Sequence, residues 1–505
     1  MADFAKTIAE GYAVEGPSID LGRGVHEGKL EQDAVVRLPL KTMNRHGLIA
    51  GATGTGKTRT LQLIAEQLSV QGVPVFAADY KGDVSGLREP GAADGPAAER
   101  MKELELPHEP TGFPVEFLSL GGIGPGVPVR ATVTDFGPQL LAKVLGSNET
   151  QEASLALVFR FADERGLPLV DLQDLRAVLT YLDSKEGKAE LKELGGVSGA
   201  TIGVLLRSLV ALEDGGGTEF FGEPQLEIAD LLRTTPDGKG VITCLELAAV
   251  QDKPKLFSTV LMWLVAELFE QLPEVGDPEK PRLVFFFDEA HLLVDEATKA
   301  FLDSVERTVR MIRSKGVGVF FVTQAPTDLP SSVLGQLGSR VQHALRAFTP
   351  EDADALRKVV RTYPKSEFYD LEQLLTSLGT GEAAVVVLSE KGVPTPVVHT
   401  RLRGPQSSMT PSPDLAAAAA AASPLAAKYA QRLDRESAAE RLAARVEAAP
   451  EPEAEKEPIL KPKRGRAKPP KPPSDPLTDF LGSRAGRQIE REVIRGVFGM
   501  LRKRL

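Results

Sequence analysis

The chain is poor in several features that mark particular classes of protein. Its single cysteine, Cys244, cannot form an internal disulfide bond, and the apolar run around it at 240–245 favours a buried strand position over a reactive thiol. No apolar stretch reaches the roughly 18 residues that a membrane-spanning helix needs. Residues 1–16 contain acidic residues and lack the apolar centre of a signal peptide. These absences predict a soluble, cytoplasmic protein without a membrane span.

The chain also lacks an excess of positive charge. It contains 60 basic and 70 acidic residues among 505, which gives a formal net charge of −10. This balance argues against a protein that coats nucleic acid with its whole surface, although a local basic patch or the interior of a ring remains compatible with it. The length is sufficient for more than one domain and a large core.

A glycine-rich segment carries the strongest motif. Residues 51–58, GATGTGKT, match G-x-x-x-x-G-K-[ST], the phosphate-binding P-loop. The three glycines let the backbone curl until successive N–H groups face one phosphate group. Lys57 can then reach the β- and γ-phosphates, and the hydroxyl of Thr58 can bind Mg²⁺. The predicted nucleotide-binding residues are Gly51, Ala52, Thr53, Gly54, Thr55, Gly56, Lys57, Thr58 and Arg59.

The context of this motif separates it from a glycine-rich turn that matches by chance. Residues 46–50 indicate a short buried strand, and residues 59–70 indicate a helix. The positive end of that helix would face the bound anion, as a P-loop requires.

Most of the chain alternates short β-rich runs with longer helical patterns. Over residues 1–404 this alternation predicts an α/β fold with a mostly parallel sheet. Several runs are uninterrupted apolar segments, which is typical of strands covered on both faces. The strand candidates are Leu48–Ala50, Val73–Ala78, Val115–Leu120, Val241–Leu247, Leu283–Phe287, Val317–Thr323, Arg340–Arg346 and Ala383–Leu388.

The composition and hydrophobic pattern of the sequence change twice. Between residues 136 and 236, apolar residues recur at helical spacing, which predicts an α-helical insertion between an N-terminal part of the core, 1–135, and a C-terminal part, 237–404. Residues 405–475 predict a low-complexity, charged linker that includes a charged helical segment at 428–446, so we expect a partly disordered tail. Residues 476–505 predict a basic amphipathic helix, which could contact DNA or a membrane surface, or pack on the core.

An apolar run that ends in two acids predicts the second half of a nucleotide-hydrolysing site. Residues 283–287 are apolar and are followed by Asp288 and Glu289. Asp288 would hold the Mg²⁺ shell, and Glu289 would position and polarise the attacking water. Transfer of phosphate to a small acceptor needs no such water activator, so the pair indicates hydrolysis. An acidic helix start after a strand is the alternative interpretation.

Two further side chains are candidates for the same site. Gln324 follows the apolar run 317–322, and it could sense the γ-phosphate if its strand lies between the P-loop strand and the acidic strand. Rings of hydrolytic P-loop proteins usually complete the site with an arginine from the neighbouring subunit. We expect Arg340 to have that role; the alternative is that it is an ordinary surface arginine. The other candidates are Arg310, Arg313 and Arg346.

Residues 79–83, DYKGD, follow the second predicted strand. Loops at the carboxyl ends of parallel strands face the ligand crevice. Lys81 could therefore contact nucleotide, DNA or a neighbouring subunit, or it could lie in a solvated turn. His291 has no partner at metal-ligand spacing, which favours a helix-start position over a metal ligand.

The ordered set of motifs resembles the HerA/FtsK superfamily of P-loop motor ATPases, and most closely its bacterial HerA-like branch (helicase HerA-like C-terminal domain). The resemblance covers roughly residues 17–404. It implies a RecA-like core, ATP as substrate with Mg²⁺, hydrolysis between subunits of a homo-oligomer, often a hexamer, and translocation on double-stranded DNA. The motifs that carry it are HGLIAG at 46–51, DYKG at 79–82, FDEAH at 287–291, VTQAP at 322–326 and GSRV at 338–341.

Some features depart from that family or from its relatives. HerA proper has a β-barrel before its motor that helps to dock a nuclease, but only about fifty residues precede the P-loop here, so a nuclease partner is doubtful. Asp288 to His291 also spell a DEAH box. Two-domain helicases place that box much closer to the P-loop, so this class of helicase fits the sequence less well. Asn44 and Asn148 are the only asparagines, and neither forms the Asn-Lys-x-Asp motif of GTPases; the transporter signature Leu-Ser-Gly-Gly-Gln is also absent.

The sequence thus predicts an ATPase, with DNA translocation or unwinding as its expected task. The catalytic residues we expect are Lys57, Glu289, Gln324 and Arg340, with Thr58 and Asp288 at the metal. An ATP-dependent switch or scaffold that recruits a partner through its C-terminal tail is the alternative.

Overall fold

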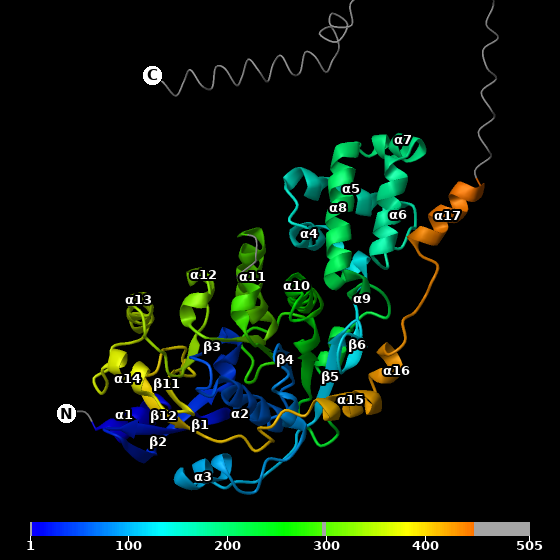
Figure 1. The fold of residues 1–505 in the computed structure, drawn as a ribbon. Coiled ribbons are helices and arrows are strands. Elements are labelled where there is room, and N and C mark those ends of the chain that lie inside the picture. Colours follow the sequence, from blue (N-terminus) through cyan, green and yellow to red (C-terminus); the bar gives the residue numbers. More distant parts are fainter. Residues whose placement is uncertain (1–2, 295–298, 449–505) are drawn as a thin grey trace, which may run out of the picture. The chain divides into compact units, whose positions relative to one another are not determined.

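One twelve-stranded sheet runs through the computed structural model, which describes residues 3–294 and 299–448 (Figure 1). The spatial order of its strands is β2-β1-β12-β11-β10-β3-β9-β8-β4-β7-β5-β6. In chain order the strands are β1 (Ser18–His26), β2 (Lys29–Pro39), β3 (Gly47–Ala50), β4 (Val75–Asp79), β5 (Val115–Leu120), β6 (Val127–Val129), β7 (Ile242–Glu246), β8 (Leu283–Phe287), β9 (Val317–Thr323), β10 (Ser339–Gln342), β11 (Glu382–Val386) and β12 (Val398–Leu402).

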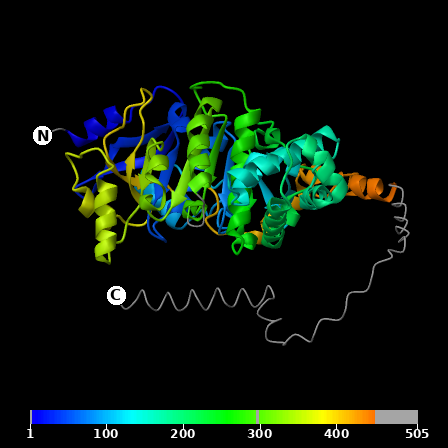
Figure 2. The same cartoon turned by 90° about the horizontal axis from the view of Figure 1, so that it is seen from above.

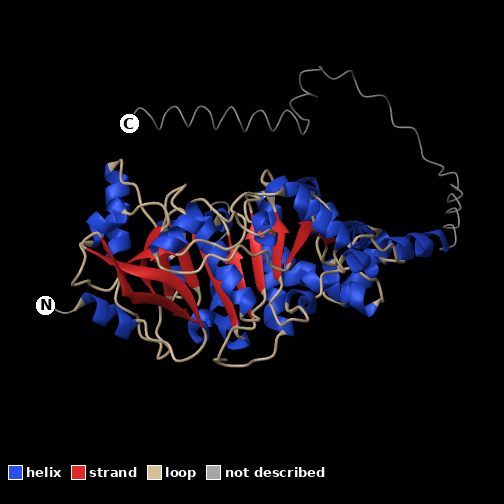
Figure 3. Cartoon of the chain, turned by 90° about the horizontal axis from the view of Figure 1, so that it is seen from below, coloured by secondary structure: helices blue, strands red, loops and turns tan. Residues whose placement is uncertain are grey.

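The sheet has a parallel body and an antiparallel margin. All neighbouring pairs from β10 to β6 are parallel, whereas β10, β11, β12, β1 and β2 pair antiparallel in succession. The central strands β3, β4, β7, β8 and β9 are buried at every position, because helices cover both of their faces (Figure 3). The expected mostly parallel α/β fold is therefore confirmed.

Helices pack on both faces of this sheet. Helix α2 belongs to a buried cluster on one face with α1 and α15, and α10 and α11 contribute to a second cluster on the other face. No helix among the described residues combines the length and apolar character that crossing a bilayer requires. The α-helices are α1 (Phe4–Gly11), α2 (Lys57–Val70), α3 (Pro96–Glu103), α4 (Val133–Val144), α5 (Glu149–Glu164), α6 (Leu172–Asp183), α7 (Lys185–Glu193), α8 (Gly199–Leu212), α9 (Thr218–Phe220), α10 (Pro254–Gln271), α11 (Lys299–Ile312), α12 (Ser331–Leu334), α13 (Pro350–Val360), α14 (Leu371–Ser377), α15 (Pro413–Ala422), α16 (Ala426–Tyr429) and α17 (Ala438–Ala448).

The segment between β6 and β7 is mainly helical, and helices α4 to α9 all come from it. Within residues 3–448 they lie toward the same side as β5 and β6, and α1 lies at the opposite side (Figure 2). Side-chain caps begin several of these helices: Asn148 and Asp171 each form a reciprocal capping box. The helices lie between Val133 and Phe220, and the division of the chain into an insertion at 136–236 and a core stays a prediction.

The start of the expected linker is folded. Helices α15, α16 and α17 lie within residues 413–448. The structure therefore differs from the linker that the sequence predicts from residue 405, and α17 overlaps the helical segment expected at 428–446. The alanine-rich stretch packs because small side chains allow close approach: Ala416, Ala419 and Ala420 are buried, as are Tyr429 and Leu442. The rest of the expected linker and the amphipathic helix expected at 476–505 lie outside the described residues.

Candidate nucleotide and metal site

The P-loop connects the central strand β3 to helix α2. Gly51 has a φ of 153°, and a Cβ atom there would lie 2.5 Å from Cβ of His343, so only glycine fits beside the end of β10. Lys57 is 8% exposed, and its Nζ donates to the carbonyl oxygens of Gly51 at 2.7 Å and of Ala52 at 3.3 Å. Burial lowers the pKa of this ammonium. Its contacts, in this structure, are the loop's own carbonyl oxygens.

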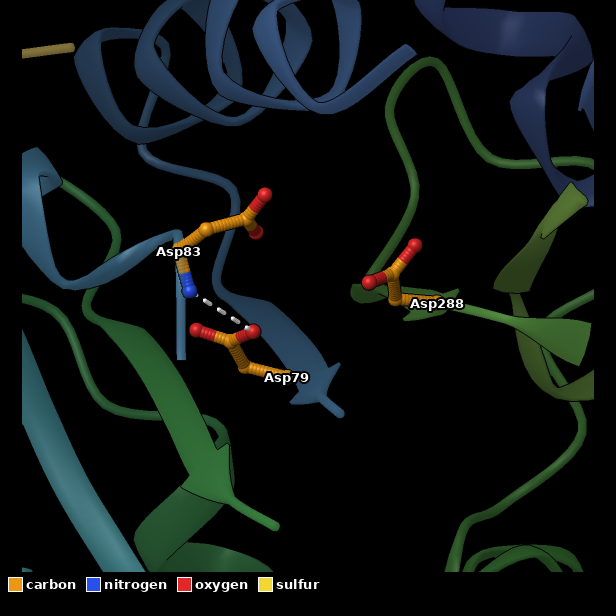
Figure 4. Close-up of side chains that lie close together, drawn as sticks. All are labelled: Asp79, Asp83 and Asp288. Carbon is orange, nitrogen blue, oxygen red and sulfur yellow. Dashed lines mark hydrogen bonds between the residues drawn. The ribbon is translucent and has the colours of Figure 1, made fainter. Parts of the chain in front are cut away.

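Three carboxylates meet at the carboxyl ends of neighbouring strands (Figure 4). Asp79 ends β4, Asp83 follows in the next loop, and Asp288 follows β8; an oxygen from each lies within 4.8 Å of the others. The hydroxyl of Thr58 donates to Oδ2 of Asp83 at 3.1 Å, which joins the P-loop to this cluster. Asp288 is 4% exposed, and its Oδ2 has no hydrogen-bond partner among the described residues.

Asp79 has a different role from the other two carboxylates. Its oxygens accept hydrogen bonds from three successive backbone N–H groups: those of Gly82 at 2.8 Å, Asp83 at 3.2 Å and Val84 at 2.9 Å. This arrangement fixes the loop after β4. Asp79 therefore orients the loop that carries both Lys81 and Asp83.

Glu246 adds a fourth carboxylate. It ends β7, where it pairs in register with Asp79, and its Oε1 is buried without a hydrogen-bond partner in the described part of the chain. Burial, together with the charges of Asp79 and Asp83, raises the pKa of Glu246 to about 8. Burial also raises the pKa of Asp79 to about 6, and burial with the charge of Glu289 raises that of Asp288 to about 7.

This donor set fits a divalent cation. Mg²⁺ takes oxygen ligands, often one or two carboxylates together with water and phosphate oxygens. The hydroxyl of Thr58, the carboxylate of Asp83 and the unpartnered Oδ2 of Asp288 supply such oxygens within one cluster. Burial is the main cause of the raised pKa values of Asp79 and Asp288, and the neighbouring carboxylates raise them further. A bound cation would offset this accumulated negative charge.

Glu289 occupies a strained backbone position beside this cluster. Its φ of 48° lies in the left-handed region, which is uncommon for residues other than glycine, and the residue is 3% exposed. Nζ of Lys81 forms an ion pair with its Oε1, and Nδ1 of His291 lies 3.2 Å from its Oε2. The lysine whose contacts were left open by the sequence therefore meets the predicted water-positioning acid.

Of the other predicted residues, Gln324 lies at the carboxyl edge of the sheet, whereas Arg340 lies apart from it. Strand β9 lies between β3 and β8, and the exposed Gln324 follows its carboxyl end. Arg340 pairs in register with Leu48 near the start of β10; its guanidinium donates to Oγ1 of Thr362 at 2.5 Å and lies 5.7 Å from the ring centre of Tyr363. Arg340 thus makes its contacts away from the P-loop of its own chain.

Sequence reasoning missed Asp83 and Glu246 as members of the site. Asp83 had a usable signal, since it stands four positions after Asp79 in the loop that follows the second predicted strand. Glu246 offered a weaker one, an acid near the end of the apolar run 241–247. Its meeting with Asp79 depends on β7 lying next to β4, which periodicity alone does not reveal.

Comparison with known sequences identifies relatives of this chain. A model of the helicase HerA-like C-terminal family matches residues 25–504. The chain is 30% identical over 155 residues to a probable helicase of Methanocaldococcus jannaschii, covering 29% of this chain and 28% of the relative. It is 23% identical over 397 residues to the DNA double-strand break repair helicase HerA of Pyrococcus furiosus, covering 72% and 67%. The chain therefore spans at most about two thirds of the length of these relatives.

Solved structures show the same fold at low sequence identity. The plasmid coupling protein TrwB in complex with the ATP analogue ADPNP superposes with a TM-score of 0.55 at 15% identity, covering 82% of this chain and 95% of that one. VirB4 of Thermoanaerobacter pseudethanolicus gives a TM-score of 0.50 at 16% identity, covering 77% and 97%. The family match covers nearly the whole sequence and agrees with the P-loop between β3 and α2. The chain therefore belongs to the helicase HerA-like C-terminal family and has the fold of a P-loop ATPase.

Proposed function

We propose that the protein hydrolyses ATP at the carboxyl edge of β3, β9, β8 and β4. The observation that carries the proposal is the convergence of the P-loop with Asp288 and Glu289, which directly follow β8, a strand separated from β3 by β9 alone. Backbone N–H groups of the P-loop and the ammonium of Lys57 would bind the phosphates. ATP is preferred because the sequence lacks the base-reading motif of GTPases.

Mg²⁺ is the metal ion we propose for this site. Thr58, Asp83 and Asp288 would hold it, and when bound it would neutralise charge on the phosphate oxygens. Asp79 would keep the loop of Asp83 in place through its three backbone contacts. Glu289 would orient the attacking water, and Gln324 would contact the γ-phosphate from the end of β9.

The complete site is proposed to lie between subunits of a homo-oligomer, for which a hexamer is the expected form. Arg340 is the candidate that would reach a neighbour's phosphates. A mixture of Arg340→Ala and Glu289→Gln subunits tests this role, because each would supply what the other lacks. Both parents should be assembled and inactive, and the mixture should recover activity. An assembled mixture without activity would remove the support for Arg340.

We further propose that hydrolysis drives movement on double-stranded DNA. Membership of the HerA-like family and similarity to a helicase named for DNA double-strand break repair support this proposal. The test is the rate of ATP hydrolysis with and without duplex DNA at increasing salt. A motor should be accelerated by DNA at low salt and lose that response as salt rises, because phosphate contacts are screened. Steady hydrolysis that DNA does not change would instead favour a non-translocating switch or scaffold.

A further inference from the structure

Both carboxylate oxygens of Glu289 are buried, and each lies beside a nitrogen atom of another side chain. Oε1 is paired with Nζ of Lys81, and Oε2 lies 3.2 Å from Nδ1 of His291. Only 4% of its side chain is exposed. A water that is to be oriented for attack must donate a hydrogen bond to one of these oxygens. In this arrangement the water competes with an existing partner.

Lys81 is the partner that can leave. Its side chain is 42% exposed, whereas that of His291 is 24% exposed and begins only two residues from Glu289. The backbone of the loop that carries Lys81 is held by Asp79, so the flexible side chain can change its contact while the loop stays in place.

The nucleotide site provides a competitor for this lysine. Glu289 and Lys81 are both close enough to Lys57 to influence its pKa, after the larger effect of burial. Two ammonium groups and one carboxylate therefore surround the region where the motif places the terminal phosphates. A triphosphate carries more negative charge than Glu289, and it would draw both ammonium groups toward itself.

We propose that Lys81 is a positioning residue that holds Glu289 in the nucleotide-free protein and transfers to the γ-phosphate when ATP binds, which frees Glu289 for water. This inference rests on the proposed ATP hydrolysis. The Lys81–Glu289 ion pair and the contact of Lys81 with the γ-phosphate exclude each other, because one ammonium group cannot make both. Removing the first should strengthen the second.

Binding measurements on four proteins test this exclusion: the unaltered chain, Glu289→Gln, Lys81→Met and the double variant. The probes are a non-hydrolysable ATP analogue and ADP, so that turnover does not affect affinity. Glu289→Gln should tighten the analogue about threefold to fivefold, the size of a partly exposed ion pair. Lys81→Met should weaken it about tenfold, the size of a hydrogen bond to a charged group. ADP, which has no γ-phosphate, should change less than twofold.

The double variant and two controls separate this mechanism from a structural role of Lys81. The gain from Glu289→Gln should vanish when Lys81 is already methionine. Lys81→Arg should restore most of the analogue's affinity, and Lys391→Ala, at an exposed lysine between β11 and β12, should leave it unchanged. Melting temperatures of all variants show whether they are folded.

Two results would overturn the inference while leaving the proposed function intact. One is an equal loss of affinity for the analogue and for ADP in Lys81→Met. The other is a gain from Glu289→Gln that persists without Lys81. If the unaltered, folded chain binds neither nucleotide, the proposed ATPase function and this inference fail together.

Discussion

Two acidic clusters in the molecule use their oxygens in opposite ways. At the carboxyl edge of β7, β4 and β8, Glu246 Oε1 and Asp288 Oδ2 are buried without hydrogen-bond partners among the described residues. In the helical insertion, Asp174 is 1% exposed, and its oxygens accept four hydrogen bonds: from the N–H groups of Val170, Asp171 and Ala439 and from the hydroxyl of Ser437.

The insertion cluster serves to attach the C-terminal segment. Asp230 accepts hydrogen bonds from Lys428 at 2.9 Å and from the hydroxyl of Tyr429, and Asp171 pairs with Arg432 at 3.1 Å. These contacts join residues 413–448 to parts of the chain that precede them by about 200 to 265 positions. A carboxylate with all its oxygens used builds structure, whereas a buried one with a free oxygen is suited to a ligand.

The largest expected difference between the two clusters is in catalysis. Glu289→Gln should reduce ATP turnover about 10²- to 10⁴-fold, because an amide cannot activate water, while nucleotide binding persists. Steady-state hydrolysis and nucleotide titration measure the two quantities. The matched control Glu274→Gln, at an exposed position, should retain turnover. Normal turnover in Glu289→Gln would show that another group activates the water.

The insertion cluster should respond in stability instead. Asp174→Ala removes the acceptor of four hydrogen bonds and should lower the free energy of unfolding by about 2–4 kcal/mol, since buried donors lose their partner. Urea denaturation measures this loss, and hydrolysis per folded molecule should be unchanged. Asp163→Ala, at an exposed site on α5, should cost less than about 0.5 kcal/mol. Equal losses in both variants would contradict the structural role of Asp174.

A smaller effect is expected in the metal requirement. Asp83→Asn should raise the Mg²⁺ concentration for half-maximal hydrolysis about tenfold, because it removes a charged oxygen from the proposed metal site. Asp94→Asn, at an exposed position, serves as the control. An unchanged Mg²⁺ requirement with Asp83→Asn would show that Asp83 does not take part in metal binding.

The smallest expected effect is in the pH dependence of stability without metal. Folding raises the pKa values of Asp79, Asp288 and Glu246 to about 6, 7 and 8. The stability that these neutral forms contribute is complete below about pH 4 and is lost as pH rises through those values. In chelator the melting temperature should fall by a few degrees between pH 5 and 8, because these carboxyl groups then become charged in the folded protein. Glu246→Gln should reduce that fall; an identical fall would remove Glu246 from the effect.

The sequence allowed the central fold and half of the site to be predicted because their signals are local. The apolar runs at Leu283–Phe287 and Val317–Thr323 coincide with β8 and β9, since strands buried on both faces need no alternation. The P-loop and Asp288-Glu289 are short motifs of fixed composition. Their proximity followed from the expected position of β9 between their strands, which the sheet order confirms.

The remaining features depend on contacts between distant parts of the chain. Strands β1 and β2 were not predicted; they form the antiparallel edge, where burial is partial and the pattern is irregular. The low complexity of the alanine-rich segment at 416–422 predicts a linker, although alanine has the highest helix propensity. The structure shows it as part of helix α15, which packs on the core. The ion pair of Lys81 with Glu289 likewise requires β4 and β8 to be neighbours.

The contact of Gly51 with His343 makes the phosphate loop and β10 a single mechanical unit. The N–H of His343 donates to the carbonyl of Ala50 at 2.7 Å, and the N–H of Ala52 donates to the carbonyl of Ala344 at 2.8 Å. With no side chain between them, the two backbones lie in close contact and are joined by both hydrogen bonds. A displacement of β10 at its Arg340 end would therefore also displace the P-loop, which we propose binds the phosphates.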